Sequence, residues 1–229
     1  MSTAALRLRW AAVHGLARAV LTLRERRGDP MARLVLGRAG RGQHLRLIEE
    51  VRAQGRLVRT PTVWVSADHE VCRTVLRDNA FRVSDPDETG LPRPLVTLVR
   101  RLDPELPNPV EPPAMLMTDP PEHTEYRRLV SRSFTPKSIA SLQERIADIT
   151  TALLDDLAHR DTVDLVADYA AQLPAAMITE ILGVPATDRH LVLGWGTGAS
   201  PLLDIGISWP VYRAAMDDLR NVETYLTAH

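Results

Sequence analysis

Ten of the 17 prolines in this 229-residue chain fall between residues 86 and 121. They stand at positions 86, 92, 94, 104, 107, 109, 112, 113, 120 and 121. Because proline fixes φ, lacks a backbone donor and restricts the residue before it, this region cannot form a long helix. Within it, the apolar run from Leu95 to Leu102 is long enough for one or two helical turns. A loop of this length inside a compact domain is usually functional, or else it is a linker. Its apolar residues argue against a solvated linker; they are Leu91, Leu95, Val96, Leu98 and Val99.

The patterns on both sides of the loop predict a mainly α-helical fold with a small β-sheet near the amino terminus. Before the loop, apolar spacing and turn signals predict a helix over 43–54, strands over 56–59 and 62–66, and a helix from the cap Asp68 to about 78. After it, we expect helices over about 120–133, 136–157, 168–182, 188–196 and 209–228, with a short strand over 162–166. Asp119 and Thr135 are the expected N-caps, Gly183 is the expected stop, and Pro174 should kink its helix or mark its start.

The amino-terminal segment is basic and amphipathic. Residues 1–60 carry 13 Arg against 4 Asp and Glu, although the net charge of the whole chain is -1. On a helix over residues 6–23, one face would collect Leu6, Trp10, Val13, Ala17, Val20 and Leu21. Arginines interrupt this stretch, which excludes a membrane span and argues against a signal peptide. The helix would either lie on an anionic membrane surface or pack on its own domain, and we favour packing. We therefore expect a basic segment over 1–40 and a folded domain over 41–229.

Composition excludes several classes of protein. A single cysteine allows neither an internal disulfide framework nor a zinc site with several thiolates, and it fits a cytoplasmic location. A basic amino-terminal segment is one feature of proteins that bind nucleic acid. No helix-turn-helix pair, zinc ligand set or aromatic-basic strand follows it, and we therefore expect no nucleic-acid partner.

His123 and Arg127 are the first candidate binding residues. They stand four apart on the helix that follows Asp119, so their side chains lie one turn apart on the same face. An imidazole and a guanidinium in this arrangement can bind an acidic group, and the positive end of the helix dipole favours anions there. The alternative is an ordinary solvated helix face.

The surrounding sequence resembles a known family. Residues 118–136, TDPPEHTEYRRLVSRSFTP, resemble the C-helix signature of bacterial cytochromes P450, commonly written DPPEHTxxRRLVxxxFTP. Residues 75–85, VLRDNAFRVSD, resemble the end of the family's B helix, and 173–185 resemble its E helix and the following stop. These elements follow the family order over about residues 40–229, and the resemblance is strongest to a mycobacterial-type subgroup.

The resemblance implies a haem b cofactor in the full-length protein, with His123 and Arg127 bonding its propionates. The loop over 86–118 would be the B–C loop and 202–209 the F–G region, both facing a hydrophobic small-molecule substrate. The candidate pocket residues are Leu95, Val96, Val99, Met115, Met117, Leu203 and Ile205. Arg128 and Arg132 would help to dock an acidic ferredoxin, the usual electron donor with its reductase, or would be ordinary surface residues.

The family's haem-thiolate region is not found in this sequence. The family needs a thiolate ligand in an F-x-x-G-x-x-x-C-x-G loop and a long central I helix, and neither motif occurs here. Cys72 lies on an early helix without a glycine loop, so we expect a small buried hydrophobe rather than an iron ligand. We therefore expect an incomplete P450-like fold, no metal ligand or catalytic residue in this chain, and weak or absent haem binding.

Two functional hypotheses remain. The first is the amino-terminal part of a haem-thiolate monooxygenase that hydroxylates a hydrophobic molecule with O2 and electrons from a ferredoxin-type partner, the chain alone being inactive. The second is a non-enzymatic, truncated helical module that binds a hydrophobic ligand or a partner. The last segment reaches Ala228 and His229 without a cap or breaker, and we expect a truncated chain.

Overall fold

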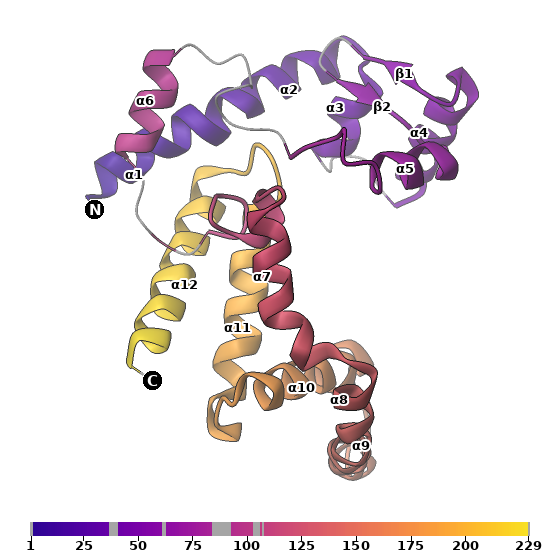
Figure 1. Cartoon of the computed structure of the whole chain (residues 1–229), viewed down its shortest axis with the longest axis vertical. Helices are drawn as coiled ribbons and strands as arrows, with labels where there is room; N and C mark the ends of the chain where they lie inside the picture. Colours follow the sequence, from indigo (N-terminus) through magenta and orange to yellow (C-terminus); the bar gives the residue numbers. More distant parts are fainter. Residues whose placement is uncertain are drawn as a thin grey trace. The chain divides into compact units, whose positions relative to one another are not determined.

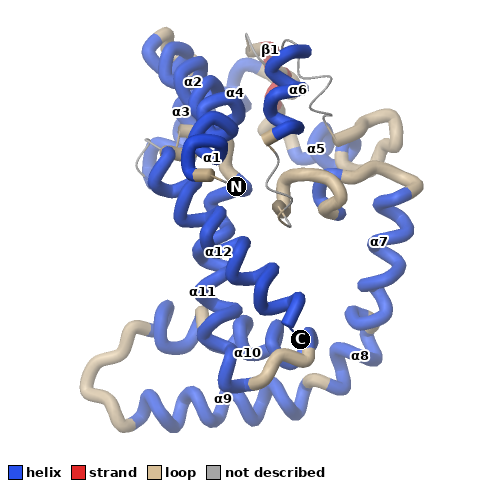
Figure 2. Tube along the Cα trace, turned by 90° about the vertical axis from the view of Figure 1, so that its left-hand side faces the viewer, coloured by secondary structure: helices blue, strands red, loops and turns tan. Residues whose placement is uncertain are grey.

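The computed structural model describes residues 2–36, 41–60, 63–83, 93–102, 106 and 108–228. Helices dominate this part of the chain, and its one sheet has two strands, in agreement with the predicted fold class (Figures 1 and 2). Two compact units are present. Unit 1 comprises Met1–Met117 with Pro201–Asp217, and unit 2 comprises Thr118–Ser200 with Asp218–His229. The boundary expected at residue 40 stays a prediction.

Unit 1 opens with one continuous helical rod made of α1 (Thr3–Trp10), a π-helical turn η1 (Ala11–Gly15) and α2 (Leu16–Arg26). This rod, which we call the amino-terminal helix, packs within unit 1, as we favoured. No helix in the described residues is both long and apolar enough to cross a membrane.

The expected apolar face of the amino-terminal helix is only partly correct. Leu6 is buried as predicted, but Val13 and Val20 are 37% and 43% exposed. In their place, Arg9 and His14 are buried, at 2% and 8% exposure. The π turn adds one residue to a turn and so shifts the phase of the residues after it. The partners of Arg9 come from distant parts of the chain, and such partners could not be seen in local periodicity.

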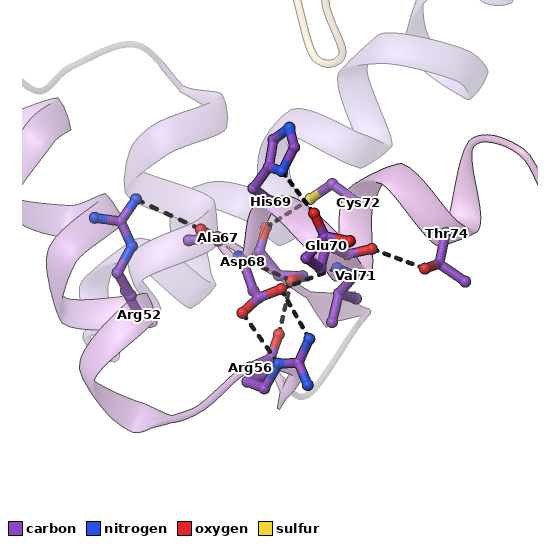
Figure 3. Close-up of polar contacts among 10 residues, drawn as sticks. Arg52, Arg56, Ala67, Asp68, His69, Glu70, Val71, Cys72 and Thr74 are labelled. Atoms are coloured by element: carbon purple, nitrogen blue, oxygen red, sulfur yellow. Dashed lines mark hydrogen bonds and ion pairs between the residues drawn. The ribbon is translucent and has the colours of Figure 1, made fainter.

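Four short elements follow the amino-terminal helix. They are α3 (Pro30–Val35), α4 (Arg41–Gln54), and the antiparallel strands β1 (Val58–Arg59) and β2 (Trp64–Val65). The strands are shorter than predicted, and beyond their open end the Ser66 hydroxyl donates to the Arg56 carbonyl at 2.7 Å. Asp68 caps α5 (His69–Val75) as expected: its carboxylate accepts from the Val71 N–H at 2.9 Å and pairs with Arg56 (Figure 3).

Two elements of the proline-rich region are described, α6 (Arg93–Arg101) and the 3-10 turn η3 (Met115–Met117). The first agrees with the short helix expected over 95–102. Leu91 and the segment 84–92 lie outside the described residues.

Unit 2 begins with α7 (Glu122–Ser131) and the 3-10 turn η4 (Arg132–Phe134), so the helix starts two residues later than expected after Asp119. Thr135 caps α8 (Pro136–Ser141) through its hydroxyl, which accepts from the Ser138 N–H at 3.1 Å. The single helix predicted over 136–157 is broken at Leu142, after which α9 (Gln143–Ala158) begins.

The strand predicted over 162–166 is wrong. The Asp164 carboxylate accepts from the Val166 and Ala167 N–H groups, at 2.9 and 3.1 Å, and these bonds start a helical segment instead. The π-helical turn η5 (Val166–Ala170) leads into α10 (Gln172–Leu182), whose first turn contains Pro174. Gly183 ends α10 with φ 70°, as predicted.

The last elements are η6 (Ala186–Asp188), α11 (Arg189–Ala199), η7 (Ser200–Leu203) and α12 (Trp209–Ala228). The bounds of α12 are those predicted from its pattern. In unit 2, the Tyr225 hydroxyl donates to Asp188 at 2.8 Å, and the Tyr225 ring lies 5.1 Å from Trp195. This hydrogen bond raises the pKa of Tyr225.

Candidate functional site on α7

His123 and Arg127 lie on the first two turns of α7. The helix forms locally because Glu122 and Glu125 stand in its first turn, where carboxylates complement the helix dipole. His123 is half-buried, and its backbone N–H donates to the Asp119 carbonyl at 3.0 Å. Arg127 is exposed. Within the described residues, no hydrogen bond or ion pair engages either side chain.

The face that carries these two side chains continues with apolar residues. Val130 stands seven residues after His123, so it shares the face of the helix with His123 and Arg127, and Phe134 follows at the eleventh position. Both are exposed, at 45% and 58%. One face of α7 and η4 therefore offers two cationic or hydrogen-bonding groups, then two uncovered apolar groups. We call these four residues the α7 face.

The polar half of the α7 face was predicted from the sequence, and its apolar half was not. The signal was present for Val130, because positions 123, 127 and 130 follow the i, i+4, i+7 spacing of one helix face, whereas Phe134 lies in the 3-10 turn that follows.

Arg128 and Arg132 lie away from the α7 face, as predicted. They are themselves four residues apart and both are exposed. No hydrogen bond or ion pair involves their side chains in the described part of the chain. Arg128 lines a groove together with Pro120, Pro121, Thr124 and Glu125. The two arginines, one on α7 and one on η4, are the second basic surface of this region.

The candidate pocket residues lie in unit 1, whereas the α7 face lies in unit 2. Val96, Val99 and Met117 are half-buried. Met115 is 37% exposed, and Leu203 and Ile205 are 55% and 61% exposed. The side chain of Leu95 lies outside the described residues. The pocket candidates therefore come from α6, η3 and the segment around η7, with uncovered apolar surface on the last of these.

The expectation that Cys72 is buried is wrong. Cys72 is exposed on α5, and its thiol donates to the Ser66 carbonyl at a sulfur–oxygen distance of 3.7 Å (Figure 3). The reason is that little of α5 packs against the rest of its unit: Val71 is half-buried, and the residues after it, Cys72 among them, are exposed. Among the described residues, no cluster of three or more His, Cys, Asp or Glu side chains has the geometry to hold a metal ion.

Solved structures with a similar fold define the class of protein. The crystal structure of the myxobacterial cytochrome P450 CYP267B1 in complex with myristic acid matches 80% of this chain and 45% of its own, with a TM-score of 0.62 and 28% identity. A mutant of P450 EryK in complex with erythromycin B matches 82% of this chain and 44% of its own, with a TM-score of 0.58 and 30% identity. The fold of the chain is therefore that of part of a cytochrome P450.

Sequence comparison agrees with the structural match. No family model matches the sequence. The cytochrome P450 140 proteins of Mycobacterium tuberculosis and Mycobacterium bovis are 38% identical to it over 224 residues, which is 97% of this chain and 51% of theirs. The chain belongs to the cytochrome P450 family, and the match is consistent with an amino-terminal portion. It spans about half the length of the curated relatives it matches.

The family implies haem in the full-length protein, and the α7 face fits that group chemically. Haem combines two anionic propionates with an apolar macrocycle. His123 and Arg127 supply a hydrogen-bond donor and a guanidinium, neither of them engaged within the described residues. Val130 and Phe134 supply uncovered apolar surface next to them. The residues present therefore match both parts of the group.

Proposed function

We propose that this chain is the amino-terminal part of a haem-thiolate monooxygenase that hydroxylates a hydrophobic small molecule with O2. The observation that carries the proposal is the α7 face, whose polar side chains lack partners among the described residues of a chain of the P450 family. When bound, haem supplies the oxygen chemistry, and an axial thiolate promotes O–O cleavage. The thiolate loop is not among the 229 residues, so we expect this chain alone to be inactive and to bind haem weakly.

In this proposal each residue of the α7 face has a stated role. Arg127 forms a bidentate, charge-assisted pair with one propionate, and His123 donates a hydrogen bond to the other. Val130 and Phe134 contact the macrocycle and keep water from that edge. Binding the propionates would break no ion pair among the described residues, because neither His123 nor Arg127 takes part in one.

The substrate-facing part is assigned to unit 1. We propose that Leu95, Val96, Val99, Met115, Met117, Leu203 and Ile205 line an apolar pocket for the substrate. Every one of them is aliphatic or a methionine, and such side chains favour a hydrophobic molecule. The bound myristic acid and erythromycin B of the two similar structures support a hydrophobic substrate but do not select one.

The electron donor is assigned to the second basic surface. We propose that Arg128 and Arg132 help to dock an acidic ferredoxin, since two exposed arginines that pair with none of the described residues favour a partner of negative charge. The domain over 41–229 and a cytoplasmic location belong to the same proposal. Nucleic acid is not among the proposed partners.

The experiment that tests the proposed function uses the full-length parent, meaning the longer protein encoded when the reading frame continues past His229. That protein is expressed with haem, reduced and exposed to carbon monoxide. The proposal predicts the absorption band diagnostic of a thiolate-bound haem. A parent without a downstream thiolate loop, or a haem-loaded parent without that band, would favour the non-enzymatic helical module.

A further inference from the structure

Two consecutive residues of the amino-terminal helix attach it to two segments that are distant in sequence. Arg9 reaches α6 and the turn at 108–111, about 90 to 100 residues away. Trp10 reaches the segment 207–209, almost 200 residues away. In Figure 1, α6 lies alongside α1, in agreement with the bond between Arg9 and Val99. One helical turn therefore touches two segments. The first consists of α6 and residues 108–114 and includes Leu95, Val96 and Val99, and the second consists of residues 206–212 and directly follows Leu203 and Ile205.

The contacts of Arg9 form a buried polar network. Its guanidinium donates to the Val99 carbonyl at 2.7 Å and pairs with the Glu111 carboxylate. The other carboxylate oxygen of Glu111 accepts from the Asn108 amide at 2.8 Å. The Asn108 amide oxygen in turn accepts from the Val110 N–H at 3.1 Å. Since Arg9 is 2% exposed, separating it from Glu111 would leave a desolvated charge, which is costly.

The contacts of Trp10 form an aromatic and backbone network. Its indole N–H donates to the Ile207 carbonyl at 2.9 Å, and its ring lies edge-on to Trp209 at 5.9 Å. One turn or two further on, His14 faces the Tyr212 ring at 5.1 Å, and Arg18 donates to the Gly206 carbonyl at 2.9 Å. This network holds the first turn of α12 and the residues that precede it.

Gly206 shows how closely the second segment approaches the amino-terminal helix. Its φ is +74°, a conformation that L side chains rarely adopt. A Cβ at this position would lie 3.3 Å from the backbone of Arg18. The segment therefore lies against the helix backbone itself and not only against side chains.

We infer that the amino-terminal helix couples the two segments energetically, so that loosening one segment also makes the other open more easily. The structural basis is that Arg9 and Trp10 share one turn, and a hydrogen-bonded turn does not allow its neighbouring residues to move independently. Arg9 and Trp10 are positioning residues in this scheme. That the coupled segments border a substrate pocket rests on the proposed function, whereas the coupling itself does not.

Hydrogen exchange of the 229-residue chain tests the coupling without haem or activity. The probes are the amides of Leu102 and Ala114, which bond to Leu98 and Glu111 in the first segment, and of Tyr212, which bonds to Ser208 in the second. Glu111→Gln removes the charge facing Arg9 and alters no bond of the second segment. We expect it to speed exchange at Tyr212 about threefold or more, besides its local effect.

The reciprocal variant is Trp10→Phe, which removes the bond to Ile207 while keeping an aromatic ring. We expect faster exchange at Leu102 and Ala114 as well as at Tyr212. Trp64→Phe is the matched control, since Trp64 lies in the same unit but is 62% exposed, and we expect no change at any of the three probes.

The inference is overturned when each variant changes only its own segment. Should Trp10→Phe unfold unit 1 altogether, the response of Tyr212 to Glu111→Gln decides alone. A missing thiolate band in the parent, by contrast, would overturn the proposal that the two segments border a substrate pocket, but it would leave the coupling intact. Failure of the proposed function and failure of the coupling are therefore distinguishable.

Discussion

The amino-terminal helix and α7 are both rich in arginine, and they use it in opposite ways. Arg9 is 2% exposed and bonded to Val99 and Glu111, so its charge is paired inside unit 1. Arg127 is exposed and has no internal partner among the described residues. A buried, paired arginine is needed for the fold, whereas an unpaired one beside uncovered apolar groups is available to a ligand. The predictions below test this division, starting with the largest expected effect.

Arg9→Met should lower the free energy of unfolding of unit 1 by about 3 kcal/mol, because Glu111 loses its partner while remaining partly buried. Arg127→Met should change the free energy of unfolding of its own unit, unit 2, by less than about 0.5 kcal/mol, since surface substitutions rarely do more. Denaturant titration followed by circular dichroism measures both. Equal losses in the two variants would contradict the division between structural and available arginines.

Acid should weaken the amino-terminal helix through His14. Burial, and after it the charge of Arg9, lower the pKa of His14 from 6.5 to about 4. As the pH falls below 6.5 the unfolded chain binds a proton that the folded chain does not yet accept, so stability that is complete above pH 6.5 is lost as the pH falls to about 4. We expect a loss of about 2 kcal/mol, allowing for solvent around the ring.

The measurement is the free energy of unfolding at several pH values in the chain and in His14→Phe, which keeps a ring against Tyr212. The variant should show a weaker dependence between pH 6.5 and 4. An unchanged slope would mean that another group carries the acid sensitivity.

Gly206→Ala should destabilise unit 1 by about 1 to 2 kcal/mol, because the new methyl group meets the backbone of Arg18 at an unfavourable φ. Gly194→Ala is the matched control. Gly194 lies inside α11, and a Cβ added there would have no neighbouring atom within 4 Å, so alanine should leave stability unchanged or raise it slightly. Thermal unfolding of both variants checks the sign of each change.

The smallest effect is expected at Asp68, which caps α5 and pairs with the exposed side chain of Arg56. Its pairing with Arg56, followed by the Val71 N–H, lowers the pKa of Asp68. Stability from this group is therefore present above the usual pKa of 3.8 and declines as the pH falls through the lower folded value. Asp68→Asn should keep the cap and lose only the pair, giving a small, salt-dependent decrease in the melting temperature. A decrease in stability as large as that of Arg9→Met would contradict the ranking, because the pair of Asp68 with the exposed Arg56 would then contribute as much as the buried pair of Arg9 with Glu111.

Local signals predicted the elements whose ends depend on neighbouring residues. The caps Asp68 and Thr135 and the stop at Gly183 are of this kind. The failures depend on contacts that periodicity does not contain. Arg9 is buried because Glu111 lies against it, and 162–166 is not a strand because the Asp164 side chain bonds the next backbone N–H groups.

The candidate site shows the same contrast. The spacing of His123 and Arg127 predicted one helix face, and the structure agrees. Their lack of partners among the described residues, and the exposure of Val130 and Phe134 beside them, required the packing of the whole unit to be known. That the amino-terminal helix bonds two segments that include or follow pocket candidates could not be predicted, since those bonds join residues about 90 to 200 positions apart.

The most direct test of the α7 face is haem retention in the full-length parent. Haem transfer to apomyoglobin is timed for the wild type, Arg127→Ala and Arg128→Ala. Arg128 is the control because it is likewise exposed and adjacent in sequence but lies away from the α7 face. We predict transfer about tenfold faster for Arg127→Ala, from the loss of a charge-assisted pair, and wild-type transfer for Arg128→Ala. Equal rates in all three proteins would contradict the assignment of the α7 face to haem.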